Sequence, residues 1–288
     1  MKAMQRVGVI GAGTMGNGIA QTCAVAGLEA VMLDVQDAAV ERGLKTIGGS
    51  LERLLKKEKI SAADRDAAMA RITATTDYAA LASCDLIIEA ATENLELKLK
   101  ILRQVDGLAR PDAMIASNTS SISITTLASV VTRPADFIGV HFFNPVPLMA
   151  LVELVRGLQT SQETINAAVV FAQRLTKTPI VVKDSPGFVV NRILCPMLNE
   201  AVYALQEGLA TAAEIDNGMK LGCGHPIGPL ALTDMIGLDV LLAVMNVFHT
   251  DFGDPKYRPP QLLKQMVAAG QLGRKSGRGF YDYTQEKK

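Results

Sequence analysis

A glycine-rich turn near the amino terminus, set between a strand-like run and a helical run, constrains the fold of this chain more than any other feature. The turn Gly11–Gly16 reads Gly-Ala-Gly-Thr-Met-Gly and directly follows the apolar run Arg6–Ile10. In such a turn the first glycine permits a tight bend, the second lets the backbone approach a pyrophosphate, and the third permits close packing of helix on strand. The amino terminus of the following helix attracts the anion. The residues expected to hold a dinucleotide are Gly11, Ala12, Gly13, Thr14, Met15 and Gly16.

The next strand-like run ends in a carboxylate, which predicts the kind of dinucleotide. Asp34 lies 18 residues after Gly16. An acid near this spacing accepts hydrogen bonds from the ribose hydroxyls of the adenosine. Because a carboxylate at this place repels a 2′-phosphate, we expect the cofactor to be NAD rather than NADP.

Strand-like and helical stretches alternate along the first half of the chain. Several strand-like runs are apolar without polar alternation, which is typical of parallel strands covered on both faces. These runs are Val7–Ile10, Ala30–Leu33, Leu86–Ala90, Met114–Ser117, Phe137–Val140, Val152–Val155 and Ile180–Val182. A long helical excursion over Asp37–Lys59 follows the second run. We therefore predict an α/β, Rossmann-type domain with a mostly parallel sheet.

Helical patterns dominate after the turn-rich segment Asp184–Gly187. The expected helices are Phe188–Gly208, Thr211–Leu221, Met235–Phe252 and Pro260–Ala269. A break of this kind, rich in glycine and proline, is typical of a domain boundary. We therefore predict a dinucleotide-binding domain over residues 1–184 and a second, all-helical domain over residues 185–288.

Composition excludes several classes of function. The 29 Lys and Arg residues balance the 29 Asp and Glu residues, so no overall charge favours nucleic acid or an anionic membrane. No uninterrupted apolar run approaches the ~18 to 20 residues that cross a bilayer. The first strand-like run begins almost at Met1, which leaves no room for a leader peptide, so we expect a cytoplasmic protein. The widely separated Cys23, Cys84, Cys195 and Cys223 predict reduced packing cysteines and no metal site.

A histidine and a glutamate stand out within two apolar runs in the middle of the chain. His141 follows Phe137–Val140, and Glu153 interrupts Leu151–Val155. A buried carboxylate needs a partner, and His141 is the nearest group able to take a positive charge. A histidine paired with a glutamate is typical of a general base. Each residue alone also fits a plainer role, His141 as a hydrogen-bonded core residue and Glu153 on a solvated strand face.

These features occur in the order found in a known enzyme family. The ordered motifs are the glycine turn, the strand ending at Asp34, SNTSS at 117–121, HFFNP at 141–145, Glu153, DSPGFVVNR at 184–192, GHPIGP at 224–229 and GRKSGRGFY at 273–281. With them the chain resembles, nearly from end to end, the (3S)-3-hydroxyacyl-CoA dehydrogenases, particularly the bacterial short-chain type. The resemblance implies NAD-dependent, reversible oxidation of a short-chain (3S)-3-hydroxyacyl-CoA, such as 3-hydroxybutyryl-CoA, to the 3-oxoacyl-CoA.

The resemblance also implies the catalytic residues. His141 corresponds to the catalytic base and Glu153 to the carboxylate that orients it, as a carboxylate orients the histidine of a hydrolase triad. Ser120 and Asn191 correspond to groups that hydrogen-bond the substrate oxygens and hold the reacting carbon against the nicotinamide. Considered alone, Ser120 better fits a helix N-cap or turn hydroxyl, and Asn191 better fits a helix-surface amide.

Cofactor, substrate and assembly contacts are carried over from the family in the same way. The further NAD contacts are Glu93, Lys98, Ser120, Asn144 and Lys275. For the coenzyme A handle of the substrate the matched positions are Ser50 and Lys57, seven residues apart on one helix face with Arg53 nearby. A solvated charged face is the plainer interpretation of that helix. The helical domain is implied to form a homodimer.

Other functions remain open at this point. One is a non-catalytic structural relative of the family, such as lambda-crystallin, although the catalytic residues are intact. A second is oxidation of a related substrate, such as 3-hydroxyadipyl-CoA or carnitine. The last is a dehydrogenase of the 6-phosphogluconate and 3-hydroxyisobutyrate type. Enzymes of that type have a different catalytic arrangement, with a lysine in place of the His–Glu pair.

Overall fold

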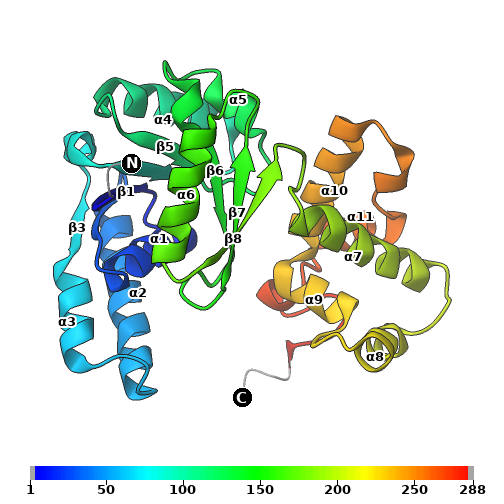
Figure 1. Ribbon diagram of the computed structural model, residues 1–288. Coiled ribbons are helices and arrows are strands. Elements are labelled where there is room, and N and C mark those ends of the chain that lie inside the picture. The colour runs from blue at the N-terminus through cyan, green and yellow to red at the C-terminus, as the bar shows by residue number, and fades with distance from the viewer. Residues whose placement is uncertain (1–3, 285–288) are drawn as a thin grey trace. The chain divides into compact units, whose positions relative to one another are not determined.

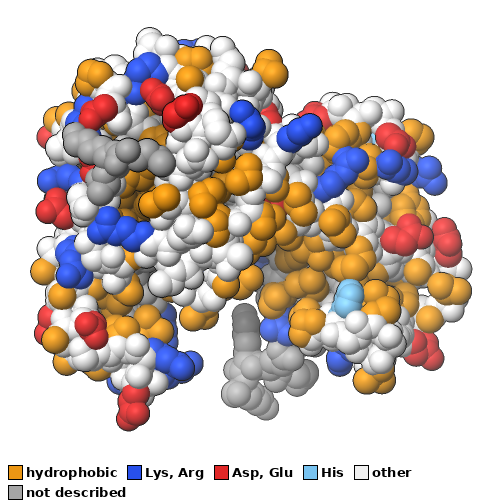
Figure 2. Space-filling view, in the orientation of Figure 1, with side chains coloured by type: hydrophobic (Ala, Val, Ile, Leu, Met, Phe, Trp, Pro, Cys, Tyr) orange, Lys and Arg blue, Asp and Glu red, His pale blue; other side chains and the backbone are white. Residues whose placement is uncertain are grey.

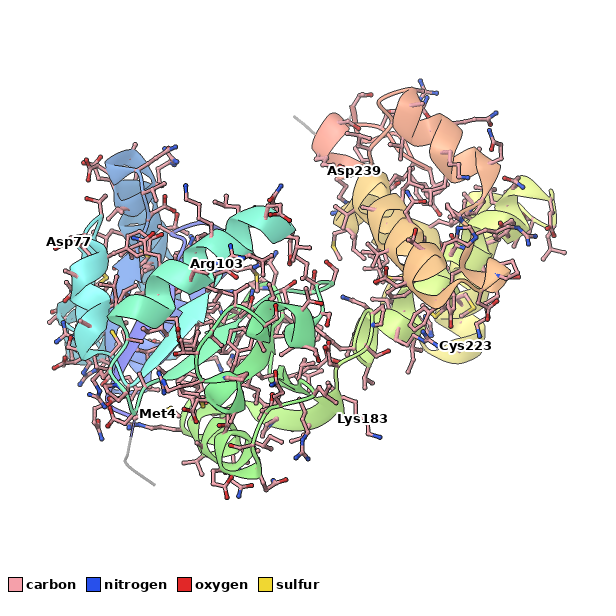
Figure 3. The ribbon with its side chains drawn as sticks, turned by 90° about the horizontal axis from the view of Figure 1, so that it is seen from above. Met4, Asp77, Arg103, Lys183, Cys223 and Asp239 are labelled. Atoms are coloured by element: carbon pink, nitrogen blue, oxygen red, sulfur yellow. The ribbon has the colours of Figure 1, made fainter. Side chains whose placement is uncertain are left out.

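The structure is a computed structural model that describes residues 4–284. Its packing divides the chain into two compact units between Ser185 and Pro186. The amino-terminal part, called the sheet unit below, contains every named strand, whereas the carboxyl-terminal part, the helical unit, is built from helices (Figure 1). Lys183, labelled in Figure 3, is the last residue of the last strand.

An eight-stranded sheet forms the centre of the sheet unit. Its order is β3-β2-β1-β4-β5-β6-β7-β8, and all neighbouring strands are parallel except β6 and β7. The strands are β1 Arg6–Ile10, β2 Glu29–Leu33, β3 Ile72–Thr75, β4 Leu86–Glu89, β5 Met114–Ser117, β6 Phe137–Phe142, β7 Leu151–Arg156 and β8 Thr178–Lys183. The order reverses between β1 and β4, and sheets of this kind bind ligands at such a switch point. The predicted α/β fold with a mostly parallel sheet is confirmed.

The helices of the sheet unit cover this sheet. They are α1 Thr14–Val25, α2 Asp37–Lys56, α3 Ala62–Ala70, α4 Leu95–Leu108, α5 Ile124–Ala128 and α6 Gln162–Arg174. Ile19 of α1 and Phe171 of α6 belong to one hydrophobic core with Val9 and Val140 of the strands. Figure 1 shows α6 in front of the central strands. The apolar strand runs are buried, as continuous Val, Ile and Leu segments predict.

The helical excursion predicted after β2 is present, since α2 covers Asp37–Lys56 and ends three residues before the predicted Lys59. A further helix, α3, follows at Ala62–Ala70 and was not predicted. Ser61 caps α3, because its hydroxyl accepts from the N–H of Asp64 while the carboxylate of Asp64 accepts from the N–H of Ser61. The edge strand β3 was not predicted, since its half-buried ITAT sequence lacks a continuous apolar run.

The helical unit holds α7 Val190–Gln206, α8 Ala212–Cys223, α9 Pro229–Ile236, α10 Leu238–Phe252 and α11 Gln261–Ala268. The expected helix Met235–Phe252 is wrong at its start, because Gly237, with φ of 110°, separates α9 from α10 and the two axes bend by 97°. The core contains Leu198, Val202, Leu230 and Phe248, from α7, α9 and α10.

Within residues 4–284 no single helix is long and apolar enough to cross a membrane. The bent pair α9 and α10 reaches the required length and apolar composition only when the two helices are taken together. The cysteines carry no disulfide: Cys23, Cys84 and Cys195 are buried free thiols and Cys223 is exposed. Burial raises the pKa of Cys23 and of Cys195 to about 12, so these thiols stay protonated. The prediction of free, mostly packing cysteines agrees with this placement.

Candidate active site

The glycine turn between β1 and α1 has the geometry that its sequence predicts. Gly11 has φ of 100°, and a Cβ at this position would lie 2.7 Å from the carbonyl oxygen of Ala90. A Cβ on Gly16 would lie 1.7 Å from the carbonyl oxygen of Gly11, so the helix could not approach the strand. A Cβ built at Gly13 meets nothing within 4 Å. The turn is therefore tight at its base and open at Gly13, where a pyrophosphate approaches in such motifs.

Asp34 follows β2 and fastens this turn. Its Oδ2 accepts a hydrogen bond of 2.9 Å from the N–H of Ala12, and its Oδ1 accepts one of 3.3 Å from the N–H of Gln36. The side chain is half-buried. In sheets of this kind a carboxylate after the second strand accepts from ribose hydroxyls, and this role of Asp34 stays a prediction.

A cavity of about 290 Å³ lies beside Asp34 at the switch point of the sheet. Tyr78, Lys100 and Gln104 line it, together with residues at the ends of β1 and β2. Burial raises the pKa of Tyr78, and the carboxylates of Asp34 and Glu89 add to this, so the phenol keeps its proton. The cavity suits the adenosine of a dinucleotide. No sequence motif predicts these three residues, and only the strand order places them here.

His141 and Glu153 form a pair across two antiparallel strands. The register of β6 and β7 places them directly opposite each other, and His141 Nδ1 lies 2.7 Å from Glu153 Oε2. Glu153 is 0% exposed and His141 is 6% exposed, so the solvated strand face considered for Glu153 is wrong. The centroid of the Phe143 ring lies 4.6 Å from the centroid of the imidazole. The contact expected between the two residues is present.

Ser120 and Glu93 also lie together, in the loops that follow β5 and β4. Glu93 Oε1 accepts from the Ser120 N–H at 2.9 Å and from the Ser120 hydroxyl at 3.2 Å. Its Oε2 accepts from the hydroxyl of Thr119 at 2.7 Å. One carboxylate therefore holds the loop that presents Ser120.

Lys98 lies inside the sheet unit rather than on a charged helix surface. Its side chain is 1% exposed and its Nζ contacts the Glu89 carboxylate, which is 0% exposed. The hydroxyl of Ser117 donates to the same carboxylate at 2.8 Å, and Oε1 of Glu89 accepts from the N–H of Ala91 at 2.8 Å. Glu89 and Ser117 had no predicted role. Each is the last residue of an apolar strand, at the edge where ligands of such sheets bind. This position is the sequence feature that could have identified them.

The remaining predicted contacts lie farther along the chain. Asn144 follows β6 by two residues and precedes Pro145 in a cis peptide bond. In the helical unit, Asn191 is the second residue of α7, and Lys275 lies in the short turn Arg274–Ser276. The ammonium of Lys275 pairs with Asp239 at the start of α10, which Figure 3 labels. The structure places Asn191 and Lys275 only within their own unit.

The positions expected to hold coenzyme A lie near the end of α2. Ser50 is half-buried in the helix, and Lys57 is the exposed residue that follows its last turn. Arg53 and Lys56 occupy that turn. Lysine and arginine at a helix carboxyl terminus interact favourably with the helix dipole, so this basic cluster has a structural role whether or not it binds phosphates.

The two units match the two domains of one protein family. Residues 6–185 match the NAD-binding domain of 3-hydroxyacyl-CoA dehydrogenase, and residues 187–283 match its C-terminal domain. The chain belongs to the 3-hydroxyacyl-CoA dehydrogenase family. It is 51% identical to a probable 3-hydroxybutyryl-CoA dehydrogenase of Deinococcus radiodurans, over 96% of this chain and 100% of that one. It is 40% identical to human mitochondrial hydroxyacyl-coenzyme A dehydrogenase, over 97% of this chain and 91% of that one.

Solved structures of the 3-hydroxyacyl-CoA dehydrogenase family have the same fold. The crystal structure of (S)-3-hydroxybutyryl-CoA dehydrogenase PaaH1 from Ralstonia eutropha matches with a TM-score of 0.96 and 63% identity, over 98% of this chain and 100% of that one. The predicted family, the dehydrogenase class and NAD as cofactor are therefore confirmed. The residues at the glycine turn, Asp34 and the adjacent cavity fit NAD. Among residues 4–284 no group of three or more His, Cys, Asp or Glu side chains could hold a metal ion.

Proposed function

We propose that the chain catalyses the reversible, NAD-dependent oxidation of a short-chain (3S)-3-hydroxyacyl-CoA, such as 3-hydroxybutyryl-CoA, to the 3-oxoacyl-CoA. The observation that carries this proposal is the buried His141–Glu153 pair, with 2.7 Å between Nδ1 and Oε2. Relatives that are about half identical along the whole chain bear the name 3-hydroxybutyryl-CoA dehydrogenase, which supports the same substrate.

His141 acts as the general base in this proposal. Glu153 accepts a hydrogen bond from Nδ1–H, which selects the tautomer whose Nε2 takes the proton of the C3 hydroxyl. Bound NAD supplies the acceptor for the hydride that leaves the same carbon. The Glu153 carboxylate then stabilises the imidazolium, as in a hydrolase triad. In the reverse direction the imidazolium returns the proton to the carbonyl oxygen.

Ser120 and Asn191 hold the substrate oxygens in this proposal. Glu93 fixes Ser120 through both its N–H and its hydroxyl, so the loop is ordered before the substrate arrives. A group fixed in advance loses little entropy on binding, and its orientation lowers the barrier of the chemical step. Ser50 and Lys57 are the proposed contacts of the coenzyme A handle.

All of the proposed cofactor contacts except Lys275 lie in the sheet unit. The contacts are Gly11, Ala12, Gly13, Thr14, Met15, Gly16, Asp34, Glu93, Lys98, Ser120, Asn144 and Lys275. The open backbone at Gly13 and the position of Asp34 beside the cavity support the pyrophosphate and ribose contacts. Lys98 is buried and contacts Glu89 and Ser117, the last residues of β4 and β5, which supports an indirect part through the order of the loops that follow these strands.

The loss of NADH absorbance with acetoacetyl-CoA tests the proposal. We expect turnover with acetoacetyl-CoA and weaker turnover with longer and dicarboxylic 3-oxoacyl-CoAs. Preference for the dicarboxylic thioester would assign the chain to 3-hydroxyadipyl-CoA instead. Absence of turnover with every thioester, by a folded protein that binds NADH, would contradict the proposed reaction.

The proposed assembly is a homodimer formed through the helical unit. Figure 2 shows hydrophobic side chains gathered on the face of this unit that is turned to the viewer. Large apolar residues of this unit are exposed, and they include Ile193, Leu209, Leu221 and Met235. An apolar groove of about 480 Å³ lies between α7 and α8. Apolar surface of this kind marks an interface, and light scattering tests it: a particle of 30.7 kDa would contradict the dimer.

A further inference from the structure

The strand that carries His141 extends beyond its parallel neighbour. Pairing of β5 with β6 ends at Ser117 opposite Gly139, whereas β6 continues through Phe142. On its other edge β6 remains paired with β7 through Phe142, opposite Val152. The end of β6 that holds His141 is therefore paired with β7 and lies beyond the last residue pair of the β5–β6 ladder.

Asn118, the residue after β5, continues the contact between β5 and β6. Its side-chain Oδ1 accepts a buried hydrogen bond of 2.9 Å from the N–H of Phe142. Its own N–H donates to the carbonyl oxygen of Glu89 at 2.8 Å, and the residue is 7% exposed. The amide carbonyl of an asparagine has the same acceptor chemistry as a backbone carbonyl. Asn118 thus supplies one more sheet-like hydrogen bond at the level of the histidine.

We propose that Asn118 is a positioning residue for the base His141. The N–H that it binds belongs to the peptide bond immediately after His141, so this bond fixes the backbone from which the imidazole projects. Glu153 fixes the ring itself through Nδ1. The imidazole is therefore held from two sides, at the backbone by Asn118 and at the ring by Glu153. The inference rests on the proposed function, in which His141 takes the proton.

Asn118 also ties the base to the loop of the proposed substrate clamp. It lies two residues before Ser120, whose N–H and hydroxyl donate to Glu93. The loop after β5 is thus joined to β6 by Asn118 and to the loop after β4 by Glu93. The hydrogen bond between Asn118 and Phe142 sets the spacing between the group that takes the proton and the group that holds the substrate oxygen.

The test compares two substitutions of Asn118. Asn118→Leu keeps the approximate volume and removes the acceptor, whereas Asn118→Asp keeps an acceptor oxygen for the Phe142 N–H. We expect Asn118→Leu to lower kcat about 10- to 100-fold, which is the loss expected when a catalytic group is displaced by up to about 1 Å. We expect Asn118→Asp to retain most of the turnover, and the Kd for NADH of both variants to stay near that of the wild type. If Asn118→Leu does not fold, Asn118→Ala takes its place.

A double variant shows whether Asn118 acts through His141. In the His141→Ala background, Asn118→Leu should lower the residual turnover no further, because the base that it positions is gone. Asn199→Leu is the matched control, since Asn199 is a buried asparagine whose side-chain amide donates to the Arg258 carbonyl in the helical unit. It should lower the melting temperature and leave kcat near wild type.

Three results would overturn the inference. Unchanged kcat in Asn118→Leu would mean that the hydrogen bond has no part in catalysis. An equal loss in the His141→Ala background would mean that Asn118 acts on another group. A weakened Kd for NADH with unchanged kcat would make Asn118 a cofactor contact. An inactive wild type would contradict the proposed function itself, which separates that failure from these three.

Discussion

The imidazole of His141 and the carboxylate of Glu153 face each other across the antiparallel strands β6 and β7, with Nδ1 and Oε2 2.7 Å apart. Directly opposed residues on such strands have side chains on the same face of the sheet. Both side chains are buried, so the pair has little contact with water. Low exposure strengthens the hydrogen bond and makes the loss of either partner costly.

Replacement of Glu153 should therefore damage turnover more than binding. Glu153→Gln keeps the shape but removes the charge that stabilises the imidazolium, and we expect kcat to fall about 10²- to 10⁴-fold. The kcat of His141→Ala should fall at least as far. The Kd for NADH, measured by fluorescence titration, should stay near wild type, because neither residue is a proposed cofactor contact.

Glu163 offers the control for that experiment, since it is an exposed glutamate in the first turn of α6. Glu163→Gln should leave kcat unchanged. Wild-type turnover in His141→Ala would contradict the assignment of the base.

Asp34 should determine the preference for NAD over NADP. Asp34→Asn keeps an oxygen that can accept from the Ala12 N–H and removes the charge that repels a 2′-phosphate. We expect weaker NAD binding, because a neutral acceptor forms a weaker hydrogen bond with the ribose than a carboxylate does. We also expect better use of NADP. Steady-state kinetics with both cofactors measure the ratio, and a ratio equal to that of the wild type would show that Asp34 does not contact the ribose.

The sequence predicts local features of this fold better than contacts between distant segments. The apolar strands and the glycine turn follow from neighbouring residues, and the His141–Glu153 pair lies only 12 residues apart along the chain. The contact of Ser117 with Glu89 spans 28 residues, and that of Phe142 with Asn118 spans 24. Such contacts depend on strand order and on where each strand ends, which neither composition nor periodicity determines.

Glu93 should act on the substrate through Ser120. Its carboxylate accepts three hydrogen bonds from Thr119 and Ser120, and Glu93→Gln provides only one acceptor oxygen and a competing donor. We expect kcat/KM for acetoacetyl-CoA to fall about 10- to 100-fold, the loss of one or two hydrogen bonds to a charged group.

The variant Ser120→Ala tests the link between the two residues. If Glu93 acts by holding Ser120, the double variant Glu93→Gln with Ser120→Ala should lose little more than either single variant. Full additivity of the two losses would instead show that Glu93 acts independently of Ser120, through its proposed contact with the cofactor.

Lys98 and Glu89 should be strongly coupled in stability. Removal of one partner leaves a buried, uncompensated charge, so Glu89→Gln and Lys98→Met should each lower the free energy of unfolding by about 3 to 5 kcal/mol. The double variant should be less destabilised than the sum of the two single variants. Urea unfolding measures all three, and additive losses would show that the ion pair makes no energetic contribution.

Asp85 should make stability depend on pH through the anchor of the first strand. Its carboxylate accepts from the N–H groups of Gln5 and Arg6 and from the guanidinium of Arg110. Burial by itself acts to raise the pKa of Asp85, but these hydrogen bonds and the Arg110 charge outweigh it, and the pKa is lowered. A carboxylate with a lowered pKa stabilises the fold above its unfolded pKa of ~3.9 and loses that effect as the pH falls through its folded value.

Asp85→Asn should accordingly lower the free energy of unfolding by about 1 kcal/mol at neutral pH, after allowance for partial solvent screening. The difference from wild type should shrink as the pH falls below ~3.9, because the wild-type carboxyl then binds a proton as well. Urea unfolding at a series of pH values measures it. Asp66→Asn is the control, since Asp66 is exposed and its ion pair with Arg65 should contribute little. A constant difference at every pH would show that the Asp85 charge does not stabilise the fold.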